Sequence, residues 1–325
     1  MKFAMQQKKP LIILTGPTAV GKTNLSIGLA KAIGGEIISA DSMQVYKYMD
    51  IGSAKIMPKE MDGIPHHMLN ILEPTEEFNV TVFQTYAKRY IDEIYERGHI
   101  PILVGGTGFY IQAVLYDIDF TENEEDTTYR KQLEAEAEKY GTMYLYEKLK
   151  AVDANAAEQI HPNNIKRVIR ALEFYEQTGT CISKHNETER AKESAYSSCY
   201  FVLNDARDIL YERIDKRVDM MIEAGLVEEV QKLLQMGCKR ESTAMQGLGY
   251  KEIIDYLQGE ISLERAVYLI KRDTRHFAKR QLTWFRREKE VIWIDKEKFS
   301  YSDNEMLEFM KEQLYSKQII FDKHA

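Results

Sequence analysis

The sequence predicts an α/β fold, with a parallel sheet flanked by helices and a helical insertion domain. Short apolar runs suited to buried strands alternate with longer amphipathic segments through the first hundred residues, which is the order of βαβ units. From Asp117 to Tyr200 the segments are charged and helical in pattern, with no comparably apolar run between them. We therefore predict a core domain formed by residues 1–116 and 201–325, and a helical insertion domain of residues 117–200.

The N-terminal part of the core should alternate strands and helices. The first strand, "LIIL" (residues 11–14), leads into a helix of residues 22–33. A second strand, "EIIS" (36–39), is followed by a polar loop, a helix of residues 82–98 and a third strand, "IPILVGG" (100–106). These strands should pair in parallel, because a helix separates each from the next.

The rest of the chain is mainly helical in pattern. The insertion should contain helices within residues 129–152 and 164–179. The run "CYFVLN" (199–204) restores the strand pattern, and helices are predicted at 208–234, at 264–288 and near the C-terminus. The core domain therefore resumes after the insertion.

The stretch "GPTAVGKT" has the spacing Gly-x-x-x-x-Gly-Lys-Thr, directly after the first predicted strand. A strand, a glycine loop and a helix N-terminus together present backbone N–H groups and a positive dipole end to an anion. Lys22 adds a positive charge, and the hydroxyl of Thr23 suits Mg²⁺. The motif therefore favours a phosphate site in a P-loop NTPase-like sheet over a chance glycine turn. Its residues are Gly16, Pro17, Thr18, Ala19, Val20, Gly21, Lys22 and Thr23.

The carboxylate that usually accompanies such a loop is not in its usual place. Motor and switch NTPases hold the metal with an acid at the end of a second apolar strand, whereas "IPILV" runs into Gly105 and Gly106. Asp41 instead follows the strand "EIIS", at the edge where open α/β sheets bind ligands. We predict that Asp41 serves the metal or the chemistry; the alternative is a helix cap or turn residue.

Charge is distributed unevenly along the chain. The whole protein has a net charge of −7, yet residues 271–289 contain eight basic and two acidic residues. This basic block is compatible with a polyanion site and equally with a solvated helix face. Trp284 and Phe285 within it are typical of core packing more than of base stacking.

The composition places the protein in a reducing cytoplasm and away from membranes. Cys181, Cys199 and Cys238 are far apart, with no spacing typical of a disulfide framework or a zinc site. The first residues lack an apolar signal core, and no run of about 18 apolar residues occurs. The adjacent His66 and His67 invite a metal hypothesis, but a structural role is favoured because sequence neighbours rarely face one ion.

Several blocks together resemble the tRNA dimethylallyltransferase (tRNA isopentenyltransferase) family. They are "GPTAVGKT", "ISADSMQVYKYMDIGSAK", "PHHMLNILEP", "PILVGGTGFYI", "HPNNIKRVIRALE", "RIDKRVDMM", "GLGYKE" and "KRQLTWFRR", in order and over nearly the whole chain. The resemblance implies transfer of a dimethylallyl group from dimethylallyl diphosphate to the exocyclic N6 amine of the adenosine 3′ of the anticodon in tRNA. Diphosphate would be released and Mg²⁺ required, so the loop would hold a diphosphate that leaves intact.

The resemblance also implies catalytic roles. Asp41 would be the general base for the poorly nucleophilic amine, while Lys22 and Thr23, with Mg²⁺, would stabilise the leaving diphosphate. Arg213 and Arg217 lie one helical turn apart in "RIDKRVDMM" and could face one anion. The resemblance implies that an arginine of this block binds the diphosphate, and we favour Arg217. The alternative for both is a surface ion pair with Glu212 or Asp215.

The tRNA anticodon stem-loop is the partner that the resemblance implies, and we expect a monomer. The flipped base and its neighbours should meet residues after the second and third strands, the insertion should grip the stem, and the basic helix and the "QGLGYK" loop should approach the RNA. The expected contacts are Asp41, Ser42, Met43, Gln44, Thr107, Arg130, Lys166, Arg167, Arg170, Gln246, Gly247, Leu248, Gly249, Tyr250, Lys251, Lys279, Arg280 and Arg286.

Three other functions compete with this interpretation. A P-loop small-molecule kinase would use the same loop but would need neither the insertion nor the basic helix. An adenine-nucleotide isopentenyltransferase of the cytokinin type would share the loop and Asp41, but the insertion and the basic C-terminal region favour tRNA. A non-catalytic RNA-binding module would leave the loop and Asp41 unexplained.

Overall fold

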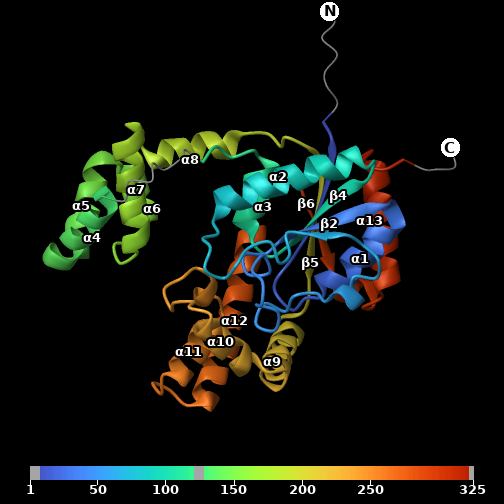
Figure 1. The fold of residues 1–325 in the computed structure, drawn as a ribbon. Coiled ribbons are helices and arrows are strands. Elements are labelled where there is room, and N and C mark those ends of the chain that lie inside the picture. Colours follow the sequence, from blue (N-terminus) through green and yellow to red (C-terminus); the bar gives the residue numbers. More distant parts are fainter. Residues whose placement is uncertain (1–7, 121–127, 322–325) are drawn as a thin grey trace, which may run out of the picture. The chain divides into compact units, whose positions relative to one another are not determined.

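The protein is described by a computed structural model for residues 8–120 and 128–321. Its chain divides into two compact units. The first, called the core unit, contains the chain up to Leu115 and from Ala195 onward, and the second, the insertion unit, is Tyr116–Ser194. Most elements of both are labelled in Figure 1.

The core unit is built on a six-stranded sheet, and its neighbouring strands all pair in parallel. The strand order is β3-β2-β4-β1-β5-β6. The predicted α/β fold is therefore confirmed. The strands are β1 (Pro10–Thr15), β2 (Gly35–Ala40), β3 (His66–His67), β4 (Ile100–Gly105), β5 (Ser197–Asn204) and β6 (Val291–Asp295).

The sheet register brings three strand ends to one level. Thr15 of β1 pairs with Gly105 of β4, and Gly105 pairs with Ala40 of β2. The next residues in the chain, Gly16, Gly106 and Asp41, therefore lie together at the carboxyl edge. Since β4 separates β1 from β2, Asp41 lies two strands away from the loop of residues 16–23, called the phosphate loop below.

Helices flank the sheet, as Figure 1 shows. One predicted helix, residues 208–234, is wrong: Gly225 has φ +100° and separates α9 from α10. The short strands β3 and β6 were not predicted. The helices are α1 (Lys22–Ile33), α2 (Val80–Glu96), α3 (Gly108–Leu115), α9 (Arg207–Glu223), α10 (Leu226–Gln235), α11 (Tyr250–Leu257), α12 (Leu263–Phe285) and α13 (Asp303–Ser316), with 3-10 turns η1 (Pro58–Glu60), η2 (Ala244–Gln246) and η3 (Lys296–Phe299).

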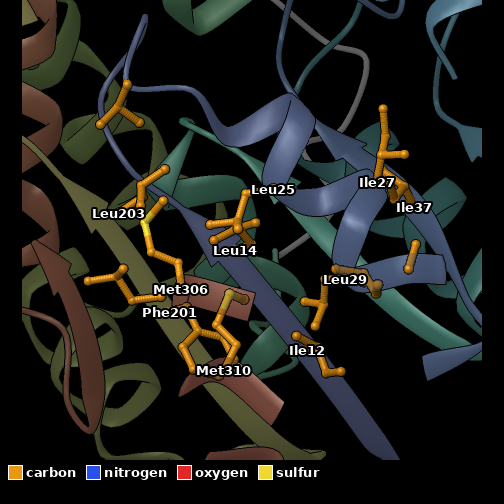
Figure 2. Packing of buried hydrophobic residues seen from close by; sticks show 14 of the residues in the cluster. Ile12, Leu14, Leu25, Ile27, Leu29, Ile37, Phe201, Leu203, Met306 and Met310 are labelled. Atoms are coloured by element: carbon orange, nitrogen blue, oxygen red, sulfur yellow. The ribbon is translucent and has the colours of Figure 1, made fainter. Parts of the chain in front are cut away.

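The core beneath the phosphate loop packs α1 and α13 against the central strands. Figure 2 shows Ile12 and Leu14 of β1 among side chains of α1 and Met306 and Met310 of α13. The intervening Leu11 and Ile13 are also fully buried, so β1 is covered on both faces, as expected for a parallel sheet. Each fully buried Leu or Ile contributes about 1.5–3 kcal/mol. The loop thus begins from a rigid strand.

The insertion unit is a small helical bundle with its own core. Leu133, Leu145, Leu149, Val168 and Leu172 are buried together between its helices. Its helices are α4 (Thr128–Tyr140), α5 (Thr142–Val152), α6 (Ala154–Gln159), α7 (Ile165–Thr178) and α8 (Ile182–Ala191).

Two further findings bear on the predicted organisation. Strand β5 begins at Ser197, earlier than residue 201, where the core was predicted to resume. Across the described residues, no helix combines the length and apolarity that crossing a bilayer requires.

Candidate active site

The phosphate loop joins β1 to α1 through two glycines. Gly16 has φ +150° and Gly21 has φ +100°, conformations that residues with a side chain rarely adopt. A Cβ at Gly16 would also lie 2.4 Å from the carbonyl oxygen of Leu203. Because of these glycines the chain turns back over β1, and the first turn of α1 borders a cavity at the sheet edge, the strand-end cavity.

Two positive charges line the strand-end cavity. Lys22 Nζ donates hydrogen bonds to the carbonyl oxygens of Gly16 (3.0 Å) and Pro17 (2.8 Å). Arg217 of α9 is half-buried and has no hydrogen bond or ion pair to any residue within 8–120 and 128–321. Burial and the charge of Arg217 lower the pKa of Lys22 to about 7, with Asp41 acting in the opposite direction. Two cations with no contacting carboxylate make this side of the cavity suitable for an anion.

The carboxylate of Asp41 is held on the other side of the same cavity. Its Oδ1 accepts hydrogen bonds from the backbone N–H groups of Met43 (2.8 Å) and Gln44 (3.2 Å). Oδ2 accepts none from the described part of the chain. The turn therefore orients Asp41 while leaving one oxygen available to a ligand.

The polar side chain of Gln44 also borders the strand-end cavity. Its Oε1 accepts a hydrogen bond from Ser39 Oγ (3.0 Å), and its Nε2 donates to the carbonyl oxygen of Ser53 (3.3 Å). Gln44 thus fixes the loop after β2 to the segment that follows it.

The floor between the two sides is made by glycines at the end of β4. A Cβ at Gly105 would lie 2.2 Å from the carbonyl oxygen of Ala40, and one at Gly106 would lie 2.1 Å from Nε2 of Gln281. No side chain therefore projects from β4 between the phosphate loop and Asp41. The places where such side chains would project are occupied by the backbone of Ala40 and the amide of Gln281.

Part of the cavity wall is apolar. The side chains that share this character are Ile37, Ile56, Leu69, Val104 and Phe277. A cavity with cations at one side, a carboxylate at another and an aliphatic wall suits a ligand that carries both an anionic and a hydrocarbon part.

The two arginines of "RIDKRVDMM" have different surroundings. Arg217 lines the cavity, whereas Arg213 Nη1 donates to Asp205 Oδ2 at 2.7 Å. Neither pairs with Glu212 or Asp215, which contact Lys216 and Arg275 respectively. The ion pairs considered as the alternative are therefore not the ones that form.

Residues beside Asp41 meet the "QGLGYK" loop. A Cβ at Gly247 would lie 2.8 Å from Met43 Sδ, so the two loops are in contact. Ser42 is half-buried, and the backbone N–H of Thr107 donates to the carbonyl oxygen of Ala40 (3.3 Å). These residues lie at one edge, although Thr107 does not line the cavity itself.

The "QGLGYK" loop is anchored by its tyrosine. Tyr250 is fully buried and its hydroxyl donates to Glu229 Oε1 at 2.8 Å. The Glu229 carboxylate also accepts the backbone N–H groups of residues 50–52 at 2.8–3.0 Å. Tyr250 therefore holds loops together and its side chain does not face solvent. Gln246 is exposed, Leu248 and Lys251 are half-buried, and Gly249 is buried.

The basic helix α12 presents two faces. Lys279, Arg280 and Arg286 are exposed, and the first two line a shallow surface hollow with Trp284. Phe285 is fully buried, as the core interpretation expected. The opposite face contributes Phe277 and Gln281 to the strand-end cavity.

The four basic residues of the insertion unit that were predicted to contact RNA have different surroundings. Arg130 forms a bidentate pair with the buried Glu173, at 2.8 and 2.9 Å. Lys166 and Arg167 of α7 are exposed, and Arg170 is half-buried with a pKa lowered by burial. Lys166 and Arg167 are thus the more accessible cations of this set.

Sequence analysis missed Gln281 and Phe277 as cavity residues. They lie four positions apart in a helix whose basic residues suggested a surface role only. That spacing could have indicated a common face, but not which face pointed inward.

Comparison with known proteins places the chain among well-defined relatives. A family model described as IPP transferase matches residues 44–288. The tRNA dimethylallyltransferase of Lachnoclostridium phytofermentans is 62% identical over 312 residues, 96% of this chain and 99% of that protein. That of Carboxydothermus hydrogenoformans is 56% identical over 290 residues, 89% of this chain and 93% of that protein.

Solved structures show the same similarity. The full-length tRNA isopentenylpyrophosphate transferase from Bacillus halodurans matches with a TM-score of 0.72 and 46% identity, over 96% of this chain and 98% of that one. A eukaryotic dimethylallyltransferase acting on tRNA matches with a TM-score of 0.75 and 34% identity, over 88% and 74% of the two chains.

Proposed function

This chain belongs to the IPP transferase family, and from that premise we infer how it works as a tRNA dimethylallyltransferase. It transfers a dimethylallyl group to tRNA, as the names of its relatives state for them. Our proposal concerns the finer steps: the donor is dimethylallyl diphosphate, the acceptor is the N6 amine of the adenosine 3′ of the anticodon, and the strand-end cavity is where they react. The cytoplasm is the compartment that we propose.

The phosphate loop holds the diphosphate of the donor in this proposal. Support comes from Lys22 and Arg217, which meet in the cavity without a carboxylate in contact with either. As the allylic C–O bond breaks, negative charge grows on the diphosphate, and these cations with the loop N–H groups stabilise it. The aliphatic wall near Ile37 and Val104 would accept the hydrocarbon part.

Magnesium is the metal that fits this donor set. The side chain of Thr23 is exposed at the first turn of α1, on the cavity wall, and its hydroxyl together with diphosphate oxygens offers the hard oxygen ligands that Mg²⁺ prefers. When bound, the ion would neutralise part of the charge on the leaving diphosphate.

Asp41 is the general base in this proposal. The single observation that carries it is the orientation of Asp41 by two backbone N–H groups on Oδ1, at the edge of the cavity that Lys22 and Arg217 also line, with no hydrogen bond to Oδ2 from the described residues. A carboxylate in that position can accept the amine proton as nitrogen attacks the allylic carbon.

The RNA would reach this edge with its target base flipped out of the stack. Anticodon-loop bases are unpaired, which lowers the cost of flipping. The exposed cations Lys279, Arg280, Lys166 and Arg167 would contact the phosphate backbone, so their contribution should weaken with salt.

The experiment incubates the protein with dimethylallyl diphosphate, Mg²⁺ and an anticodon stem-loop RNA, followed by nucleoside mass analysis. We expect one dimethylallyl group on the adenosine 3′ of the anticodon, and none when that adenosine is replaced by uridine. A chelator should stop the reaction. ATP-dependent phosphorylation of a small acceptor, without any mass gain on RNA, would favour the kinase alternative and refute the proposal.

A further inference from the structure

We propose that Gln281 is a positioning residue for the transfer reaction: it fixes the phosphate loop to the end of β4 and so sets the spacing between the two substrates. The inference rests on the proposed function, because it concerns where the diphosphate and the base lie relative to each other.

Gln281 connects two backbone segments that belong to different strands. Its Oε1 accepts a hydrogen bond from the backbone N–H of Thr18 at 2.8 Å, and its Nε2 donates to the carbonyl oxygen of Gly106 at 2.9 Å. Thr18 lies in the phosphate loop after β1, and Gly106 directly follows β4. One amide group therefore joins the phosphate loop to the floor of the strand-end cavity.

The surroundings show that this bridge is tightly built. Gln281 is only 6% exposed, and a Cβ at Gly106 would lie 2.1 Å from its Nε2. Gly106 has no positive φ, so its backbone conformation alone does not require glycine. The close approach of Gln281 is what excludes a side chain at this position.

Positioning explains the contacts better than direct catalysis does. The amide oxygen and one of its N–H groups bind backbone groups of the site's own segments, and the amide carries no proton that it could exchange with a substrate at neutral pH. The segments it joins carry the two halves of the site: the loop with Lys22 on one side, and on the other the end of β4, which pairs with β2 just before Asp41. Small errors in this spacing reduce the rate because the attacking and leaving groups no longer align.

The first test compares two variants of buried glutamines. Gln281→Met keeps the length of the side chain but removes both hydrogen bonds. Gln84→Met is the matched control, because Gln84 is also buried and donates to a backbone carbonyl oxygen, that of Ala113 (2.7 Å), away from the cavity. The measurement is the single-turnover rate constant for transfer to a stem-loop RNA. Enzyme and dimethylallyl diphosphate are both present at saturating concentrations and in excess over the RNA. That rate constant does not depend on the fraction of enzyme that is folded.

We expect Gln281→Met to lower this rate constant by about tenfold or more, and Gln84→Met to leave it within about twofold while lowering the melting temperature. Equal rate constants for the two variants, with only their melting temperatures changed, would overturn the proposal. If the native protein itself transfers no dimethylallyl group, the proposed function fails instead, so the two failures are distinguishable.

The second test asks whether Gln281 acts through Gly106. Gly106→Ala should slow transfer because its methyl group displaces the Gln281 amide. The double variant Gly106→Ala/Gln281→Ala removes that clash, so its rate constant should be no lower than that of Gln281→Ala alone. Strictly multiplicative losses in the double variant would mean that the two positions act independently, and would contradict the bridge.

Discussion

The two ends of strand β2 each present a carboxylate, but their surroundings differ. Glu36 lies near the start of the strand and is 1% exposed. It accepts hydrogen bonds from Arg97 Nε (2.9 Å) and Nη2 (2.7 Å), His67 (2.7 Å) and His99 (2.6 Å). Asp41 follows the other end and, within the described part of the chain, accepts two backbone N–H groups, both on one oxygen.

The comparison separates a structural charge from one available for chemistry. The hydrogen bonds of Arg97, followed by those of His67 and His99, lower the pKa of Glu36 to about 2 against the opposing effect of burial. Its acceptor capacity is used by the protein itself. At the other end, among residues 8–120 and 128–321, Lys22 and Arg217 contact no carboxylate and Asp41 Oδ2 accepts no hydrogen bond, so an external ligand is needed to complete that cluster.

The largest effect should come from Asp41→Asn. The amide oxygen can still accept the N–H groups of Met43 and Gln44, so the turn should persist while the base is lost. We expect the single-turnover rate constant to fall by about 10²–10⁴-fold, with an unchanged melting temperature. Retention of more than about a tenth of the native rate would show that Asp41 is not the base and would remove the main contrast between the two ends.

The matched change at the other end is Glu36→Gln. It removes the charge of a buried carboxylate but leaves Arg97, whose side chain is 44% exposed, in contact with water, so we expect a loss of about 1–3 kcal/mol in the free energy of unfolding, measured by chemical denaturation at neutral pH. The single-turnover rate constant should stay near the native value. A large loss of rate without a loss of stability would contradict the structural role of Glu36.

The stability difference between native protein and Glu36→Gln should also depend on pH. Because folding lowers the pKa of Glu36 from 4.5 to about 2, its contribution is present above pH 4.5 and is lost as the pH falls toward 2. Subtracting the two denaturation series isolates this window from other carboxylates. A difference that is constant across it would show that the carboxylate charge is not what Arg97 and the histidines stabilise.

The Asp41 end of this contrast could be predicted from sequence, because several parts of the site are local in the chain. The phosphate loop is eight consecutive residues, Asp41 follows a recognisable strand, and Arg217 belongs to a distinctive block. The α/β fold and the family were predicted on the same basis and are confirmed; the roles of individual site residues remain predictions.

Other features depend on contacts between distant segments. The partners of Gln281 lie 263 and 175 positions away, and Glu229 binds backbone N–H groups that no side-chain pattern marks. The position of β4 between β1 and β2 also depends on the order of strands in the sheet, which the sequence does not show. The strand β3 has two residues, too few to show the alternation of apolar and polar residues that marks a strand. It is nevertheless the element that brings His67 to Glu36.

The smallest expected effect is a pH dependence of anion binding that arises from Lys22, at the Asp41 end of the sheet. Its pKa is lowered to about 7, first by burial and then by the charge of Arg217, so the ammonium is partly neutral above that pH when no anion is bound. A diphosphate favours the charged form, and binding above pH 7 must therefore take up a proton. We expect the affinity for inorganic pyrophosphate with Mg²⁺, measured by calorimetry, to weaken by up to about tenfold per pH unit above 7 from this group.

Lys22→Arg is the control, because a guanidinium stays protonated throughout and retains only the pH dependence of pyrophosphate itself. Identical pH profiles for the two proteins would mean that Lys22 is already charged before the anion arrives, and that the cations at this end of the sheet are satisfied by the protein, like those around Glu36.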